Sequence, residues 1–246
     1  MKRIMINGRW PLNLPDHRAE RESWPYWEAT RLAAMHHFIE PGDVVYDVGA
    51  EAGDFAALFA TWGARVVLIE PNPKAWPTIK AVWEMNGLEP QACIVALLSD
   101  HNDGRPFSTS FTGWPPESEG PIDEAHGFHH IGESDAPTLM LDAIAGLPAI
   151  ITMDVEGGEG HVLRGAERTL TEVKPAVFAS LHPQFMRDLY DEDVNDIHAL
   201  MKGHGYHGRF LCEDHEMHFV WTHPDSGRMF PGVAEDYYIP GDRIVL

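Results

Sequence analysis

The fold of this chain can be predicted from one stretch, Gly42-Asp43-Val44-Val45-Tyr46-Asp47-Val48-Gly49-Ala50-Glu51-Ala52-Gly53-Asp54. Its β-branched run, Val44 to Val48, predicts a buried strand, and the turn Pro41-Gly42-Asp43 precedes that strand. Apolar side chains then recur at the spacing of an amphipathic helix, at Phe55, Leu58, Phe59 and Trp62. A strand, a glycine-containing turn and a helix in this order are typical of an α/β fold with a parallel sheet.

Strand-like and helix-like segments alternate over most of the chain. Besides 44–48, strands are predicted at 65–69, 94–98, 149–153, 176–181, 208–212 and 218–222. Asn72-Pro73 is expected to cap a helix that contains Trp76, and a later helix is expected from about Gln184 to Met201. The pattern therefore predicts a parallel sheet with helices on both faces.

Two regions interrupt this alternation. Residues 1–40 are expected to form an N-terminal cap segment, with one helix that ends near Ile39, and residues 41–246 the main domain. Residues about 101–137 are rich in glycine and proline, and long insertions of this kind are usually functional or mobile. We expect this insertion to select the substrate, with Trp114 as a lid contact and with the histidines as weaker contacts, at positions His126, His129 and His130.

Composition and charge exclude several classes of function. The formal net charge of −20 would repel a nucleic acid backbone or an anionic lipid surface, so duplex nucleic acid and membrane are not expected partners. The longest uncharged stretch, Ala143 to Met153, is far shorter than the roughly 20 residues of a membrane span. Only two cysteines occur, Cys93 and Cys212, and we expect free thiols in a cytoplasmic protein. The sequence leaves open whether the chain forms a homo-oligomer.

The turn after the first strand has the pattern D-x-G-x-x-x-G, from Asp47 to Gly53. A dinucleotide fingerprint that starts at Gly49 would need glycine where the chain has Glu51 and Asp54, and the G-K-[S/T] of a P-loop is absent. Carboxylates beside the glycines favour a positively charged ligand over a pyrophosphate. One alternative stays open, that the glycines only make a tight turn.

An acidic residue, Glu70, ends the second predicted strand. A carboxylate at that place accepts hydrogen bonds from both hydroxyls of a ribose. S-adenosylmethionine combines a ribose with a sulfonium and an ammonium group, so it matches this set of acids. The alternative is a purely structural role, in which Glu70 caps the helix that follows.

The chain resembles the FkbM family of class I S-adenosylmethionine-dependent methyltransferases over about residues 41–222. Five runs carry the resemblance, and they are Gly42-Asp43-Val44-Val45-Tyr46-Asp47-Val48-Gly49-Ala50, Ile69-Glu70-Pro71-Asn72-Pro73, Ala96-Leu97-Leu98-Ser99-Asp100, Thr138-Leu139-Met140-Leu141-Asp142 and Met153-Asp154-Val155-Glu156-Gly157-Gly158-Glu159. The resemblance implies a Rossmann-like, doubly wound, seven-stranded and mostly parallel sheet. It also implies methyl transfer, typically to an oxygen of a sugar or natural product.

The resemblance also implies which residues bind the cofactor. These are expected to be Asp47, Gly49, Ala50, Glu51, Gly53, Glu70, Pro71, Ser99, Asp100 and Asp154. The chain departs from the family at Glu51, where asparagine is usual, and at Asp54, where an aromatic residue is common. These departures concern the contacts to the methionine end of the cofactor.

Acids and histidines follow three of the predicted strands on the sheet edge where ligands bind. Asp154 and Glu156 follow one strand, His182 follows the next, and Asp214-His215-Glu216 connects the last two. We predict His182 as the general base for an acceptor hydroxyl, with Glu156 or Asp154 orienting it. A weaker hypothesis places a divalent metal among Asp154, Glu156, His182 and His215, where it would hold a vicinal diol.

The most favoured function is therefore O-methylation of a hydroxyl on a sugar or small polar metabolite. The acidic charge favours an acceptor that is neutral or cationic. A non-catalytic module that binds S-adenosylmethionine is a second hypothesis, which Glu156 and His182 disfavour because a binder does not need them. Nitrogen methylation of a protein or nucleobase is a third, and the absence of a D/N-P-P-[Y/F] tetrapeptide after the fourth strand counts against it.

Overall fold

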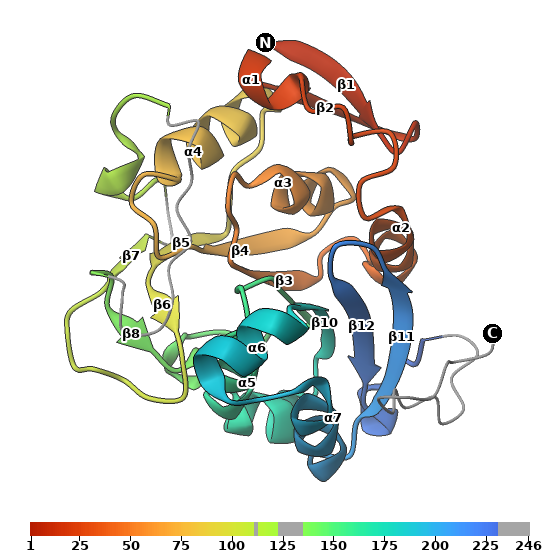
Figure 1. The fold of residues 1–246 in the computed structure, drawn as a ribbon. Coiled ribbons are helices and arrows are strands. Elements are labelled where there is room, and N and C mark those ends of the chain that lie inside the picture. The colour runs from red at the N-terminus through yellow and green to blue at the C-terminus, as the bar shows by residue number, and fades with distance from the viewer. Residues whose placement is uncertain (111–112, 123–134, 231–246) are drawn as a thin grey trace.

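The computed structural model describes residues 1–110, 113–122 and 135–230. Within them, an eight-stranded sheet forms the centre of the molecule (Figure 1). Its strands, in spatial order, are β11 (His207–Glu213), β12 (Met217–Thr222), β10 (Ala176–Leu181), β9 (Ile150–Met153), β3 (Val44–Val48), β4 (Arg65–Ile69), β5 (Ala92–Val95) and β7 (Ser108–Ser110). The run from β10 to β5 is parallel, whereas β12 and β7 pair antiparallel with their neighbours. The predicted mostly parallel α/β sheet is confirmed, with β7 as an additional edge strand.

Helices cover both faces of this sheet, as expected for a doubly wound fold (Figure 1). One face packs against α2 (Ala29–Phe38), α3 (Asp54–Thr61) and α4 (Trp76–Met85), and the other against α5 (Glu159–Arg164), α6 (Pro183–Tyr190) and α7 (Val194–Gly203). Successive strand residues alternate between the two cores. Val45 and Leu68 belong to the first core, and Tyr46 and Ile69 to the second.

Residues 1–40 lie over the α3–α4 side of the sheet. They form the hairpin of β1 (Lys2–Ile6) and β2 (Trp10–Leu14), the short helix α1 (Asp16–Ala19) and then α2. The helix predicted to end near Ile39 is confirmed as α2, whereas the hairpin was not predicted. Asn13 and Asn86 exchange hydrogen bonds between the hairpin and the end of α4, at 2.9 and 2.8 Å. Trp10 and Leu14 are buried in the same core as α3 and α4.

The strand predicted at 94–98 is divided in the structure. β5 ends at Val95, and β6 (Leu97–Leu98) leaves the main sheet to pair in parallel with β8 (Thr138–Leu139). The strand is divided because the end of the insertion at about 101–137 returns to the core beside Leu97. The backbone N–H of Leu97 donates to the carbonyl of Pro137 at 2.9 Å. A pattern of apolar residues does not reveal which of two strands a segment will pair with.

Two helix predictions also need correction. The helix expected from Gln184 to Met201 is two helices, because Asp191 adopts a left-handed conformation with φ of 53° and Asp193 caps α7 with a capping box. Asn72 does not cap α4, which begins at Trp76. The Asn72 side chain instead accepts a hydrogen bond from the backbone of Lys74 at 3.0 Å, which stabilises the turn between β4 and α4.

Two further properties follow from the described residues. No helix among them is long and apolar enough to cross a membrane. Cys93 and Cys212 are free cysteines, on β5 and β11 respectively. The two strands lie near opposite edges of the sheet, as predicted.

Candidate active site

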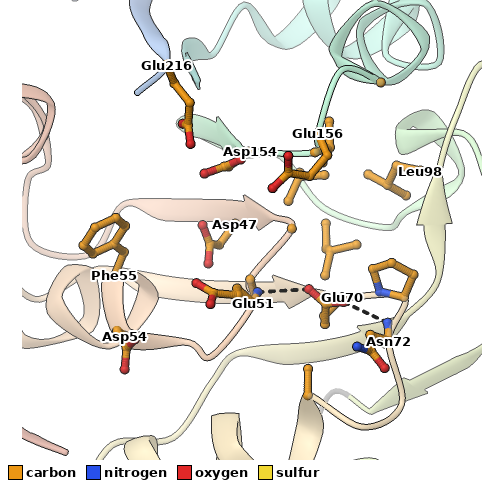
Figure 2. Close-up of a pocket in the computed structure, with 18 of the residues that line it drawn as sticks. Asp47, Glu51, Asp54, Phe55, Glu70, Asn72, Leu98, Asp154, Glu156 and Glu216 are labelled. Carbon is orange, nitrogen blue, oxygen red and sulfur yellow. Dashed lines mark hydrogen bonds between the residues drawn. The ribbon is translucent and has the colours of Figure 1, made fainter. Parts of the chain in front are cut away.

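A cavity of about 510 Å³ opens at the carboxyl ends of β3, β4 and β9 (Figure 2). This volume is within the usual range for small-molecule sites, about 300–1,000 Å³. Its walls come from the turn after β3, the end of β4, the segment after β9, the β11–β12 connection and the N-terminal segment. The cavity therefore lies where ligands bind in open α/β sheets.

Gly49 brings the turn after β3 against the end of β9. Its φ is +81°, and a Cβ atom there would lie 2.1 Å from the carbonyl oxygen of Asp154. The backbone N–H of Gly49 also donates to Ile69 at 2.9 Å. Only glycine fits this position, because both the conformation and the close approach exclude a side chain.

Gly53, which we predicted to bind the cofactor, lies where two helices pack together. It begins α3 with a φ of +73°, and a Cβ atom there would lie 2.9 Å from the Ile79 side chain. Gly53 thus allows α3 to pack against α4. It is not among the residues that line the cavity.

Glu70 organises the backbone at the end of the cavity that the turns after β3 and β4 form. Its carboxylate accepts hydrogen bonds from the backbone N–H groups of Glu51 at 2.9 Å and Asn72 at 2.8 Å, as Figure 2 shows. Burial raises the pKa of Glu70 to about 7, although these two hydrogen bonds oppose the shift. Glu70 is therefore a buried acid that joins the turns after β3 and β4.

Asp47 is a second buried acid in this part of the cavity. Burial raises its pKa to about 7, and the charge of Arg31 opposes the shift. Among the described residues, none donates a hydrogen bond to its carboxylate. A buried carboxylate without a donor is costly. Asp47 is therefore available to a cationic or hydrogen-bonding ligand.

Most of the predicted cofactor residues line the cavity, and three do not. Those that line it are Asp47, Gly49, Ala50, Glu51, Glu70, Pro71 and Asp154. Ser99 is fully buried, and Asp100 accepts from His161 at 2.9 Å, so neither these two nor Gly53 reach the cavity. The apolar wall is formed by Ala96, Leu97 and Leu98 instead, because β6 turns toward β8 before Ser99.

The predicted cluster of acids and a histidine is present. His182 Nε2 lies 3.6 Å from Asp154, 3.4 Å from Glu156 and 3.3 Å from Glu216, and Nδ1 lies 3.1 Å from Glu159. Figure 2 shows the carboxylates of Asp154, Glu156 and Glu216 together on one side of the cavity. Three strand ends, those of β9, β10 and β11, thus bring five ionisable groups to one place.

His182 is positively charged in this arrangement. Burial acts to lower its pKa, but hydrogen bonds to Glu159 and Glu216 and the charge of Asp154 outweigh burial and raise the pKa to about 11. A protonated imidazole cannot accept a proton. His182 is also only 9% exposed and is not among the lining residues. These surroundings argue against the general-base role that we predicted for His182.

The carboxylates around His182 respond to each other's charge. Burial and the charge of Glu216 raise the pKa of Asp154 above its usual range, and burial also raises that of Glu156. Burial acts in the same direction on Glu216, but the hydrogen bond and charge of His182 outweigh it and lower the pKa of Glu216. Among these three carboxylates, Asp154 and Glu156 therefore have a higher proton affinity than Glu216.

His215, part of the predicted metal set, lies away from the centre of this cluster. It is 46% exposed, and its ring nitrogens lie 2.9 Å from Asp214 and 2.9 Å from Glu216. Its ring also packs on Trp27, with a centroid separation of 4.8 Å. Glu216, for which the sequence suggested no specific role, takes the central position instead.

The N-terminal segment supplies basic and aromatic groups that sequence patterns did not indicate. Arg18 donates to Asp54 at 3.0 Å and to Glu51 at 3.1 Å, and Arg31 donates to Thr152 at 2.7 Å. Arg18 therefore neutralises the charges of Glu51 and Asp54, the two acids of the glycine turn, within the protein. Arg31 also pairs with Glu28, three residues before it. The other partners, Asp54, Glu51 and Thr152, lie more than 30 residues away along the chain, so no local signal marks these contacts.

Three cavity-lining acids adopt a conformation that is unusual for residues with a side chain. Glu28, Glu51 and Glu156 have φ values of 42°, 49° and 54°. Such left-handed conformations cost free energy and concentrate at functional sites. They place these acids at the edge of the cavity.

The model of the Methyltransferase FkbM domain matches residues 47–207 of this chain. Among solved structures, methyltransferase FkbM from Methylobacillus flagellatus KT has a TM-score of 0.52 at 18% identity, over 73% of this chain and 43% of that chain. Ribosomal protein L11 methylase from Lactobacillus delbrueckii subsp. bulgaricus has a TM-score of 0.52 at 10% identity, over 80% and 77%. The match therefore spans less than half of the Methylobacillus protein. No curated protein matches the sequence. At these identities, the two structures show a shared class I methyltransferase fold.

Proposed function

Because this chain belongs to the FkbM family of methyltransferases, we propose that it transfers a methyl group from S-adenosylmethionine to a hydroxyl of a small polar acceptor. One observation carries the proposal. A single cavity has the buried acids Asp47 and Glu70 at one end and the carboxylates of Asp154, Glu156 and Glu216 at the other (Figure 2). The acids that we assign to cofactor binding thus share one cavity with the carboxylates that we assign to the acceptor.

The cofactor half fits the groups of S-adenosylmethionine. The carboxylate of Asp47, without a donor from the described residues, suits the ammonium group. Glu70 has lone pairs beyond those that its two backbone donors use, and these suit the ribose hydroxyls. Ala96, Leu97 and Leu98 offer an apolar wall for a base. When bound, the cofactor supplies an electrophilic methyl group on a sulfonium, which leaves as a neutral thioether.

The acceptor half is formed largely by the N-terminal segment. Trp27 lines the cavity between Arg21, whose guanidinium lies 4.7 Å from its ring, and His215. An aromatic side chain in the cavity wall, held between two polar side chains, suits contact with the apolar part of a sugar or another hydroxylated ring. The acids around it favour a neutral or cationic acceptor over an anionic one.

Glu156 is the group that we assign to accept the hydroxyl proton. Its side chain lines the cavity, is 23% exposed and has a pKa raised by burial, against the opposing charge of His182. A carboxylate whose pKa lies closer to neutral is a stronger base. The charge of His182 behind it opposes protonation of the neighbouring carboxylates, so His182 is a positioning residue in this scheme.

The experiment that tests this proposal follows release of S-adenosylhomocysteine across a panel of acceptors. Sugars, glycosylated phenols, simple phenols and amines are incubated with the protein and with S-adenosylmethionine that carries a deuterated methyl group. We expect turnover with a hydroxylated acceptor and a labelled product with the methyl on oxygen. Turnover with amines alone would contradict the proposed function. Binding of S-adenosylmethionine without turnover of any acceptor would favour the non-catalytic hypothesis.

A further inference from the structure

We propose that Asp154, His182 and Glu216 bind one divalent transition-metal ion at the edge of the cavity. These three residues come from the segments after β9 and β10 and from the β11–β12 connection. Their donor atoms all lie within 4.8 Å of one another. The site itself is inferred from these residues alone, and only its role in acceptor binding rests on the proposed function.

The separations between donor atoms match those across a bound ion. His182 Nε2 lies 3.6 Å from Asp154 Oδ1 and 3.3 Å from Glu216 Oε1. Two ligands that are each about 2.1 Å from a tetrahedral ion are about 3.4 Å apart. These three atoms are therefore placed for binding one ion with little movement.

A fully buried acid behind His182 supports this inference independently. Glu159 is 0% exposed, and its Oε1 atom lies 3.1 Å from His182 Nδ1 and accepts from the Gly157 backbone at 3.2 Å. Metal-binding histidines almost always donate their other ring N–H to a carboxylate or carbonyl in this way. The contact fixes the ring and directs Nε2 toward Asp154 and Glu216.

Glu216 gives a second independent observation. The side chain is only 8% exposed, and its Oε2 atom is buried with no hydrogen-bond partner in the described part of the chain. A buried carboxylate oxygen without a partner is costly. Figure 2 shows this carboxylate directed toward Asp154. An ion between the two that is bound by both carboxylate oxygens of Glu216 would supply the interaction that Oε2 lacks.

The chemistry of the donors indicates which class of ion would bind. An imidazole nitrogen combined with two carboxylates favours Mn²⁺, Fe²⁺, Co²⁺ or Zn²⁺ over Mg²⁺ and Ca²⁺, which prefer oxygen alone. The neutral imidazole is the ligand form, so the ion takes the place of the Nε2 proton and supplies the positive charge beside Glu156 that the protonated ring supplies without an ion. Four carboxylates surround His182, those of Asp154, Glu156, Glu159 and Glu216, which suits the charge of a divalent ion.

A second set of donors nearby is less suited to an ion. Cys212, Asp214 and His218 also lie within 4.8 Å of one another. However, none of these three residues lines the cavity or has a buried side-chain atom without a partner in the described part of the chain. Asp154 and Glu216 line the cavity, and Glu216 Oε2 lacks a partner, so the set of Asp154, His182 and Glu216 is the better candidate for metal binding.

Three protein ligands leave coordination positions of the ion free. Asp154 and Glu216 both line the cavity, so these positions would face the acceptor half. An acceptor with two neighbouring hydroxyl groups would then bind the ion through both oxygens. On the proposed function, the ion selects hydroxylated acceptors and places one oxygen beside Glu156.

The test is a titration of the chelator-treated full chain with Mn²⁺, in which electron paramagnetic resonance measures free Mn²⁺. Wild-type protein should bind one Mn²⁺ per chain, and Zn²⁺ should displace it. Glu216→Gln and Asp154→Asn should each weaken binding at least about 10-fold. Glu159→Gln keeps the ligands and should weaken binding about 10- to 100-fold. The exposed neighbour Glu213→Gln is the matched control and should bind as wild type.

Two further measurements make the result decisive. Pulsed electron paramagnetic resonance of bound Mn²⁺ should show coupling to an imidazole nitrogen, and thermal unfolding establishes that each variant is folded. Absence of Mn²⁺, Co²⁺ and Zn²⁺ binding, or equal affinity in wild type and Glu216→Gln, would overturn the proposal. Calorimetry with S-adenosylmethionine on the same metal-free sample separates this failure from failure of the proposed function.

Discussion

A Cβ atom on Gly49 would lie 2.1 Å from the carbonyl oxygen of Asp154. The turn after β3 and the acidic end of β9 are therefore in direct contact, and the backbone N–H of Asp154 also donates to Val48 at 3.0 Å. This contact joins the part of the cavity that we propose binds the cofactor directly to the part that carries Asp154 and Glu156. A change on either side of the contact is expected to disturb both.

Gly49→Ala tests this contact. The left-handed conformation alone costs about 1–2 kcal/mol for a residue with a side chain, and the clash with Asp154 adds to it. Gly87→Ala is the control, since Gly87 has a φ of +65° and a Cβ atom there would have no other atom within 4 Å. Urea unfolding should show a loss of about 3 kcal/mol or more for Gly49→Ala and about 1 kcal/mol for Gly87→Ala. Equal losses would show that the close approach does not matter.

Asp47→Asn should stabilise the ligand-free protein and weaken its binding of S-adenosylmethionine. The substitution removes a buried charge without a hydrogen-bond donor, and with it the partner of the ammonium group. We expect a higher melting temperature at pH 8 and a dissociation constant raised about 10- to 100-fold, the effect of losing one charged hydrogen bond. A variant that binds the cofactor as tightly as wild type would remove Asp47 from the cofactor site.

The stability gained in Asp47→Asn should depend on pH. The pKa of Asp47 is about 7 in the folded state and 3.8 as an ordinary value, so the folded state binds more protons between these limits. Wild-type stability therefore falls, through this group, as pH rises from about 4 to about 7 and is constant above. The difference in unfolding free energy between variant and wild type should be near zero at pH 4 and reach about 1–3 kcal/mol at pH 8. A difference that does not change with pH would contradict a raised pKa.

Trp27→Ala should affect the acceptor and spare the cofactor. Trp27 belongs to the N-terminal segment, between Arg21 and His215, whereas the predicted cofactor contacts follow β3 and β4. Once an acceptor is found, its KM should rise about 10-fold or more through lost ring stacking, while the dissociation constant of S-adenosylmethionine changes less than about twofold. Loss of cofactor affinity with an unchanged KM would place Trp27 in the other half of the cavity.

Glu156→Gln should lower kcat about 10²- to 10⁴-fold, the usual effect of losing a general base. The amide keeps the shape of the side chain but cannot take the hydroxyl proton. Affinity for S-adenosylmethionine should be preserved, and Glu213→Gln on the exposed end of β11 should retain wild-type kcat. His182→Ala in the same assay tests whether His182 is the general base or a positioning residue. If His182 were the base, Glu156→Gln would remain largely active.

The sheet and its glycine turn could be predicted because local patterns determine them. The strand at Val44 to Val48 and the helix α3 can each be recognised from the pattern of apolar residues within a window of 20 residues. The division at Ala96, the two helices separated at Asp191 and the N-terminal hairpin depend on tertiary pairing and on single backbone conformations. Such features have no signal of their own in the residue pattern.

Four acids of the site could be predicted for the same reason, since each lies at or shortly after the end of a predicted strand, and they are Asp47, Glu70, Asp154 and Glu156. Glu216 was predicted only as part of a connection. Glu159 and Arg31 could not be predicted, because their roles come from contacts with His182 and Thr152 that only the folded chain creates. The charge of His182 was also missed. A histidine in isolation titrates near pH 6.5, and only the positions of four carboxylates around it reverse that expectation.

Isothermal titration calorimetry with S-adenosylmethionine and S-adenosylhomocysteine tests the central claim most directly. Both should bind the wild-type chain at one site, and NAD should not bind. Glu70→Ala should weaken both because two backbone donors and the ribose lose their acceptor, whereas Glu89→Gln, an exposed acid away from the cavity, should bind as wild type. Absence of heat with both ligands, or equal binding by Glu70→Ala, would contradict the assignment of this cavity to S-adenosylmethionine.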